Sequence, residues 1–184
     1  MVIGIVAMTD EQLIEKCIAG NAVAQRQLYD QFAKKMMGVC LRYAGGQDEA
    51  QDILQDGFIK IFQNLHRYEG KGSFEGWVRR TIVNTALDSY RKNKISRQHV
   101  EIDEASFLTA SGEDVISSIA AQDLLGIIQK LPSGYRTVFN LFAIEGYSHK
   151  EIADQMEITE STSKSQYRKA KAYLRNLIPS RETV

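Results

Sequence analysis

The sequence predicts an all-α protein with two small helical domains joined by a flexible acidic linker. Three observations lead to this prediction. The 184 residues include only two prolines, so few positions interrupt a helix. Apolar residues recur at the i, i+3, i+4 spacing of amphipathic helices, and no segment shows the alternation of a strand. This periodicity stops near residue 94 and resumes near residue 115, which indicates a linker between two helical parts.

The first three helices are predicted from their apolar faces and their ends. One helix spans residues 10–19, with Asp10 as its N-cap, and a second spans residues 22–43. The third begins at the cap Asp48 and runs to about His66. The expected apolar stripe of the first helix consists of Leu13, Ile14, Cys17 and Ile18. The expected inward face of the third helix consists of Ala50, Ile53, Leu54, Phe58, Ile61, Phe62 and Leu65.

A fourth helix is predicted from Ser73 or Phe74 to about Asn93, after a loop that contains glycines. Helical patterning returns at Val115, with Leu124 among the apolar residues, and Pro132 opens a helix that Gly146 ends. The predicted organisation is a disordered leader 1–9, a first domain 10–94, a linker 95–114, a second domain 115–178 and a tail 179–184. Met8 is an alternative natural start.

The C-terminal end of the chain has the layout of a helix-turn-helix. A short helix over residues 150–156 is followed by a tight turn at 157–159 and by a longer basic helix. Such a motif lays its second helix in the DNA major groove. The alternative interpretation is an ordinary helical hairpin with a solvated basic face. We prefer DNA binding because the turn is compact and Thr162 lies near the start of the second helix.

Charge is distributed unevenly, although the net charge is zero. Between Glu101 and Gly126 there are six acidic residues and no Lys or Arg, whereas the flanking parts are both net basic. This asymmetry indicates two DNA-facing modules joined by an acidic connector.

Several classes of protein have little support in the sequence. No run approaches the roughly 20 apolar residues that span a bilayer, and no signal peptide is recognisable, so we expect a cytoplasmic protein without membrane insertion. Cys17 and Cys40 are expected to be buried thiols. His66, His99 and His149 are scattered, and no nucleophile, phosphate loop or metal-ligand spacing appears. We therefore expect no enzymatic activity, no metal and no cofactor.

The polar side of the third helix carries three aspartates that repel one another if they are unpaired. Its residues are Asp48, Asp52, Gln55, Asp56 and Ile59. One interpretation is a solvated acidic stripe, and a metal site is a poorer one because no histidine joins the group. The third interpretation is a docking surface for a basic or polar helix, with Ile59 as an exposed apolar anchor.

The fourth helix mixes aromatic and cationic residues, as single-stranded nucleic acid requires for stacking and phosphate neutralisation. These residues are Tyr68, Lys71, Phe74, Trp77, Arg79, Arg80, Asn84, Tyr90, Arg91 and Lys92. The competing interpretation places Phe74 and Trp77 in the core and leaves the cations on an ordinary surface.

Together these segments resemble bacterial sigma factors. Residues 48–62 resemble the core-binding segment of sigma region 2, and residues 74–92 resemble the segment that melts the promoter and reads its minus-ten element. Residues 146–175 resemble region 4. The small size, with nothing but a linker between the two motifs, matches the extracytoplasmic-function (ECF) subfamily.

The resemblance implies two sets of contacts for the N-terminal part. Core RNA polymerase would be bound through the clamp helices of its largest subunit by Asp48, Asp52, Gln55, Asp56 and Ile59. The minus-ten element would be met by Arg79, Arg80, Asn84, Arg91 and Lys92. Asn84 would lie near a flipped-out base, whose pocket the loop 68–74 would supply.

The resemblance also implies the roles of the remaining parts. The minus-thirty-five element would be read by Ser161, Thr162, Lys164, Ser165, Arg168 and Lys171. The acidic linker would thread the RNA-exit path, and the polymerase flap region would be a further contact. An anti-sigma factor, clamped between the two domains, is an expected regulator. The alternative is a stand-alone helix-turn-helix regulator whose N-terminal domain dimerises or binds a ligand.

Three residues depart from the pattern of the family. Glu157 stands in the turn where Gly is usual, and a left-handed backbone there would cost about 1 kcal/mol. Ser163 replaces a branched apolar residue, which would loosen the packing of the recognition helix. Gly57 lies within the third helix and weakens it by about 0.5–1 kcal/mol relative to Ala.

Overall fold

The computed structural model describes residues 9–98 and 119–177, and every regular element in these ranges is helical. The elements are α1 (Asp10–Ile18), α2 (Ala22–Tyr43), α3 (Gln47–Asn64), η1 (Leu65–Arg67), α4 (Phe74–Gln98), α5 (Ile119–Gln129), α6 (Ser133–Phe139), η2 (Asn140–Ile144), α7 (His149–Met156) and α8 (Glu160–Leu177). Among them η1 is a 3₁₀-helix and η2 a π-helix. The all-α prediction is confirmed.

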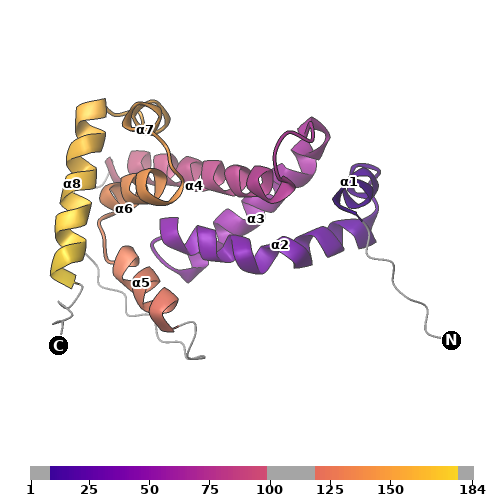
Figure 1. Cartoon of the computed structure of the whole chain (residues 1–184), viewed down its shortest axis with the longest axis horizontal. Helices are drawn as coiled ribbons and strands as arrows, with labels where there is room; N and C mark the ends of the chain where they lie inside the picture. The colour runs from indigo at the N-terminus through magenta and orange to yellow at the C-terminus, as the bar shows by residue number, and fades with distance from the viewer. Residues whose placement is uncertain (1–8, 99–118, 178–184) are drawn as a thin grey trace.

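The N-terminal unit consists of α1 to α4. The long helices α2, α3 and α4 pack against one another, and α1 crosses the far end of α2 (Figure 1). The largest fully buried side chains of this unit are Leu13, Leu28, Met36, Val39, Ile61, Leu65, Val78, Ile82 and Leu87. Their burial removes the apolar faces of the amphipathic helices from water, which is the main favourable term in folding.

The C-terminal unit consists of α5 to α8, and α8 forms its outer edge (Figure 1). A small core joins α5, α6 and α8 through Leu131, Ala170 and Leu174. Ala170 and Leu174 are both buried, and Tyr167 is half-buried.

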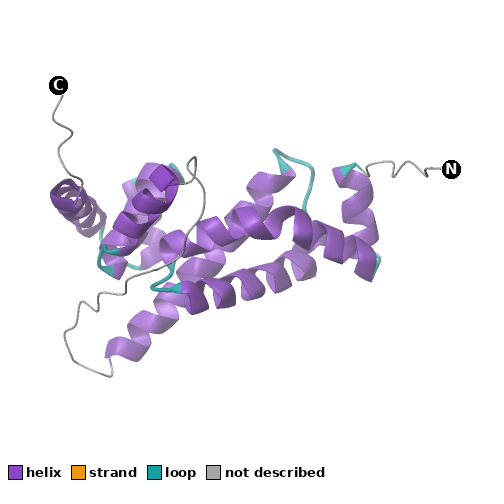
Figure 2. Cartoon of the chain, turned by 90° about the horizontal axis from the view of Figure 1, so that it is seen from below, coloured by secondary structure: helices purple, strands orange, loops and turns teal. Residues whose placement is uncertain are grey.

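The two units pack directly against each other, with the C-terminal unit at one end of α2 and α4 (Figures 1 and 2). Val138, Leu141, Ile152 and Met156 belong to the same cluster of buried residues as the core of the N-terminal unit. The side chain of Gln129 donates a hydrogen bond of 3.0 Å to the carbonyl oxygen of Leu41. The linker alone does not determine this arrangement, so the sequence could not predict it.

Several predicted helix ends and faces need correction. Thr9, rather than Asp10, caps α1, in a reciprocal capping box with Gln12. Gly46, rather than Asp48, precedes α3, and it makes no side-chain cap. Ile18 is 52% exposed and Leu124 is 49% exposed, so neither faces the core. The bounds of α4 extend to Gln98, past the expected end near Asn93.

Some predictions fall outside the described residues. These are the leader up to residue 8, the part of the linker from 99 to 114, the apolar residues 115–118 and the tail 179–184. No helix of the described ranges is long and apolar enough to span a bilayer.

Gly57 lies on the buried side of α3, where α4 approaches closely. A Cβ atom at this position would meet the Cδ1 and Cγ1 atoms of Ile82, a fully buried residue of α4. The glycine therefore permits close packing of the two helices. This packing accounts for a residue that lowers the helix propensity of α3.

We expect Gly57→Ala to lower the free energy of unfolding by about 1–3 kcal/mol, because overpacking against Ile82 outweighs the gain in helix propensity. Val has no Cδ1, so Gly57→Ala combined with Ile82→Val should be destabilised by less than the sum of the two single changes. Chemical denaturation followed by circular dichroism measures all three variants. Simple additivity in this cycle would contradict the steric explanation.

Candidate nucleic-acid interface

The acidic face of α3 lies open to solvent. Asp48, Asp52, Gln55, Asp56 and Ile59 are all exposed. At about 100° per residue they fall within about 100° of the helix circumference, so they share one side of the helix. Ile59 is 54% exposed. Among the described residues, none forms an ion pair with these aspartates. The arrangement combines uncompensated negative charge with one apolar side chain.

The predicted minus-ten residues of α4 do not all share one face. At 100° per residue, Arg80, Asn84 and Arg91 fall on one side of the helix. Arg80 and Asn84 are exposed, whereas Arg91 is half-buried and pairs with Asp88 at 3.1 Å. Lys92 is exposed on one flank of this face. Arg79 lies on the opposite flank, toward the C-terminal unit.

The aromatic residues at the start of α4 form a cluster. Phe74 is buried, and its ring stacks at 6.0 Å with that of the half-buried Trp77. The Tyr68 hydroxyl donates a hydrogen bond of 2.9 Å to the carbonyl oxygen of Gly72, which fixes the loop. The core interpretation therefore holds for Phe74. Beside this loop lies a cleft of about 500 Å³, lined by Phe32, Tyr68 and Phe74 and by acidic residues of α1 and α4.

The helix-turn-helix has well-formed helix ends. Ser148 and Glu151 form a capping box at the start of α7. The Ser148 hydroxyl and backbone N–H both donate to the Glu151 carboxylate, which lowers the pKa of Glu151. At the other end Glu157 has a left-handed backbone, with φ of 54° and ψ of 49°. It is the only non-glycine residue with positive φ in the described ranges. A side chain thus occupies a conformation that favours glycine.

Ser163 is completely buried between α7 and α8. Its hydroxyl oxygen lies 2.9 Å from Nδ1 of His149, whose ring stacks on Phe142 at 4.3 Å. Burial, followed by the positive charge of Lys164, lowers the pKa of His149. The hydrogen bond satisfies the hydroxyl of this buried serine. A polar contact therefore joins the two helices at this position.

The predicted recognition residues of α8 differ in their partners. Ser161 and Arg168 are exposed. Lys164 forms an exposed ion pair with Glu160 at 2.6 Å, and Lys171 lies 4.8 Å above the ring of Tyr167. The remaining two residues, Thr162 and Ser165, are half-buried and form hydrogen bonds within the first turns of α8. Thr162 is hydrogen-bonded to the side chain of Thr159. The hydroxyl of Ser165 donates to the carbonyl oxygen of Thr162.

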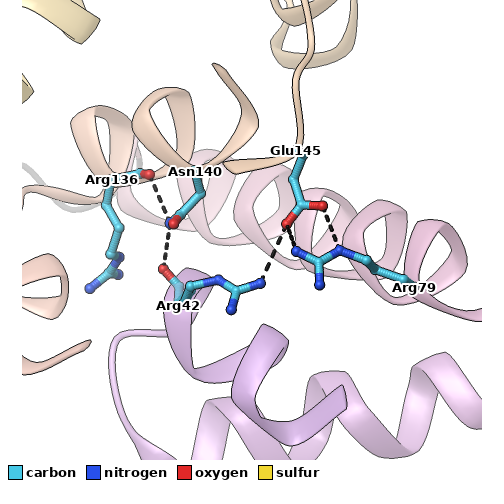
Figure 3. A network of polar contacts seen from close by, with 5 residues as sticks. All are labelled: Arg42, Arg79, Arg136, Asn140 and Glu145. Carbon is cyan, nitrogen blue, oxygen red and sulfur yellow. Dashed lines mark hydrogen bonds and ion pairs between the residues drawn. The ribbon is translucent and has the colours of Figure 1, made fainter. Parts of the chain in front are cut away.

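A buried carboxylate connects the two units (Figure 3). Glu145 follows η2, and its side chain is only 7% exposed. Nε and Nη2 of Arg79 each donate a hydrogen bond of 2.7 Å to this carboxylate, and Nη2 of Arg42 lies 3.4 Å from it. The hydrogen bonds that Arg79 donates to the Glu145 carboxylate raise the pKa of Arg79. One carboxylate therefore joins α2 and α4 to the C-terminal unit.

Asn140, at the start of η2, strengthens the same junction. Its amide nitrogen donates to the carbonyl oxygens of Arg42, at 2.7 Å, and Arg136, at 3.0 Å (Figure 3). Sequence analysis did not single out Asn140, Arg42 or Glu145. No motif marks them, because their role arises from contacts about 60 to 100 residues apart along the chain.

Metal chemistry has no visible site in the described part of the chain, where no group of three or more His, Cys, Asp or Glu side chains could hold an ion.

Comparisons with known proteins identify both halves of the chain. The family "Sigma-70 region 2" matches residues 28–95, and "Sigma-70, region 4" matches residues 121–174. The RNA polymerase sigma-H factor of Pseudomonas aeruginosa is 27% identical, covering 88% of this chain and 90% of that protein. The ECF RNA polymerase sigma factor SigW of Bacillus subtilis is 29% identical, covering 90% and 96%.

A solved structure has a similar fold. It is the sigma factor RpoE from Bartonella quintana, determined in complex with the anti-sigma factor NepR. The TM-score is 0.53 at 19% identity, and the match covers 85% of this chain and 98% of that one.

We expect Glu157→Gly to raise the free energy of unfolding by about 0.5–1 kcal/mol, because glycine adopts the left-handed conformation without strain. Glu157→Ala removes the same charge but keeps a Cβ atom, so it should give no such gain. Thermal denaturation of the two variants separates the backbone effect from the charge effect. Equal stabilisation by both would show that charge, rather than strain, is responsible.

Proposed function

The chain belongs to the sigma-70 family, as a sigma factor of the ECF type, and we propose which of its surfaces perform each step of transcription initiation. A sigma factor binds core RNA polymerase and directs it to promoters. The observation that carries the residue-level proposal is the exposed acidic face of α3, on a unit whose α4 presents basic residues on another side.

The acidic face of α3 is the proposed site for core polymerase. Asp48, Asp52 and Asp56 would attract a basic helix of the partner, and Ile59 would supply an apolar anchor. This charge is available because no ion pair within the described chain neutralises it. The proposed partner surface is the pair of clamp helices in the largest polymerase subunit.

The face of α4 that contains Arg80 and Asn84 is the proposed site for the minus-ten element. Both side chains are exposed, and the ordered loop around Tyr68 and Gly72 borders a cleft large enough for a flipped base. Arg91, Lys92 and Arg79 would add phosphate contacts from the edges of this face.

The N-terminal part of α8 is the proposed site for the minus-thirty-five element. Ser161, Lys164 and Arg168 have accessible polar groups, whereas Thr162 and Ser165 use theirs in the helix start. We therefore assign base and phosphate contacts first to the exposed three, and Lys171 to the phosphate backbone.

The stand-alone regulator is the less favoured alternative, since both sigma regions match in the same chain. We propose a non-catalytic role in the cytoplasm, where polymerase itself would perform the chemistry. The predicted flap contact, the path of the acidic linker and the binding of an anti-sigma factor stay proposals.

We expect Asp52→Arg to weaken binding of the chain to core polymerase by at least about tenfold, because it reverses a charge within the proposed contact. Gln55→Ala should have a smaller effect. Glu15→Arg makes the same charge change at an exposed position of α1 and serves as the matched control. Co-purification with core polymerase, followed by run-off transcription, measures the result. Undiminished binding of both α3 variants would contradict the proposed docking face.

We expect Arg168→Ala to weaken binding of the chain–polymerase complex to promoter DNA and to reduce the slope of log affinity against log salt by about one, if Arg168 contacts one phosphate. Arg26 is exposed on α2 and pairs only with Asp30, so Arg26→Ala is the control. Filter binding over a series of salt concentrations measures both slopes. An unchanged slope for Arg168→Ala would remove this residue from the phosphate contacts.

A further inference from the structure

Arg79 occupies two roles that exclude each other. Under the proposed function it borders the minus-ten face of α4, where a guanidinium would bind DNA phosphate. In the structure two of its nitrogens, Nε and Nη2, are already bonded to Glu145 at 2.7 Å. A phosphate can use this same Nε/Nη2 fork of the guanidinium, so Glu145 and DNA cannot both occupy this fork.

The surroundings of this ion pair also restrict the access of a nucleic-acid strand to Arg79. A cleft of about 400 Å³ lies beside it, with Arg79 and Arg80 of α4 on one wall and residues 144–147 and Glu151 of the C-terminal unit on the other. A space of this size suits a small molecule rather than a nucleic-acid strand. Glu151 also lines this cleft, and its negative charge would repel phosphate.

The junction nevertheless has features of a contact that can open. The Tyr43 hydroxyl, Nε of Arg42 and Oδ1 of Asn140 are buried without a hydrogen-bond partner among the described residues. Each such group lacks the hydrogen bond that it would make with water, which is unfavourable. Separation of the units would expose these groups to water and recover that cost. The closed arrangement is thus opposed by its own unsatisfied polar atoms.

We infer that Glu145 acts as an internal competitor of promoter DNA: it holds the free chain in a closed form in which Arg79 is unavailable to the minus-ten element. This inference rests on the proposed minus-ten site. The acidic face of α3 stays exposed in the closed form, so core polymerase can bind before the units separate. The closed form reduces the apparent affinity for DNA by the fraction of chains that are open.

The first test measures the distance between the units in the full chain. Donor and acceptor dyes are attached at Lys34→Cys on α2 and Ala172→Cys on α8, both exposed positions outside the proposed contacts. The native thiols are buried, and burial raises the pKa of Cys40 to about 12, so maleimide reacts with the introduced cysteines. We expect Glu145→Gln to lower the transfer efficiency.

Two further variants make this measurement decisive. Arg42→Gln changes the N-terminal side of the junction and should lower the transfer efficiency by a smaller amount. Because this variant leaves the C-terminal unit unchanged, it shows whether the effect of Glu145→Gln arises from misfolding of that unit. Asp154 is exposed on α7 and forms no ion pair with any described residue, so Asp154→Asn is the charge-matched control. Transfer efficiencies equal to wild type in both junction variants would overturn the inference.

The second test measures binding of the same full-length variants to a fluorescein-labelled single-stranded DNA oligonucleotide of mixed sequence. We expect Glu145→Gln to bind about three- to tenfold more tightly than wild type. In an Arg79→Ala background, Glu145→Gln should give no gain, because the residue that it releases is absent. If the units separate but DNA binding is unchanged, or if the gain persists without Arg79, the competition between Glu145 and DNA is refuted.

A failure of the proposed function can be distinguished from a failure of this inference. Binding of the wild-type chain to core polymerase does not require the units to separate. If the wild-type chain did not bind core polymerase, the proposed function would be contradicted, but the distance measurement between the units would still be valid.

Discussion

The placement of the two units depends on one buried carboxylate. Glu145 has almost no contact with water, so its charge must be compensated by protein groups, and the guanidinium groups of Arg79 and Arg42 provide this compensation. Because these arginines belong to α4 and α2, the carboxylate can be satisfied only when the C-terminal unit rests against the N-terminal unit. Val138 and Leu141 add apolar contacts, since they belong to the same buried cluster as the core of the N-terminal unit, and the ion pair favours one orientation of the two units.

The local structure before Glu145 explains how it reaches this position. In the π-helix η2 the backbone N–H of Glu145 bonds to the carbonyl oxygen of Asn140, five residues earlier. The wider turn changes the direction of the residues that follow, relative to a regular α-helix. Gly146 then adopts φ of 78°, and the N–H of Tyr147 closes onto the carbonyl oxygen of Leu141. The same irregular turn therefore places Asn140 and Glu145 at the junction and ends the helix before the helix-turn-helix.

The sequence predicts what depends on local spacing. The bounds of α2 agree with the expected 22–43, and the predicted inward face of α3 is buried except for the half-buried Phe62, since amphipathic periodicity directly reflects burial. Thr9 was missed as a cap because Asp10, also a good capping residue, follows it. The junction around Glu145 was not predicted, because it requires knowledge of which distant helices meet. The exposure of the α3 face could be predicted from its polar residues. No motif predicts that the guanidinium of Arg79 is bonded to Glu145.

The different accessibility of the two faces gives an order to the proposed function. The proposed surface for core polymerase is the face of α3 that stays exposed, whereas part of the proposed surface for promoter DNA is on the flank of α4 that faces the C-terminal unit. On this proposal polymerase binding would not depend on the junction, but full contact with the minus-ten element would require the two units to separate. A polymerase that holds the two units apart would supply that separation through differential affinity for the open form. DNA recognition would then be coupled to polymerase binding by the occupancy of a single guanidinium, without a change in the fold of either unit.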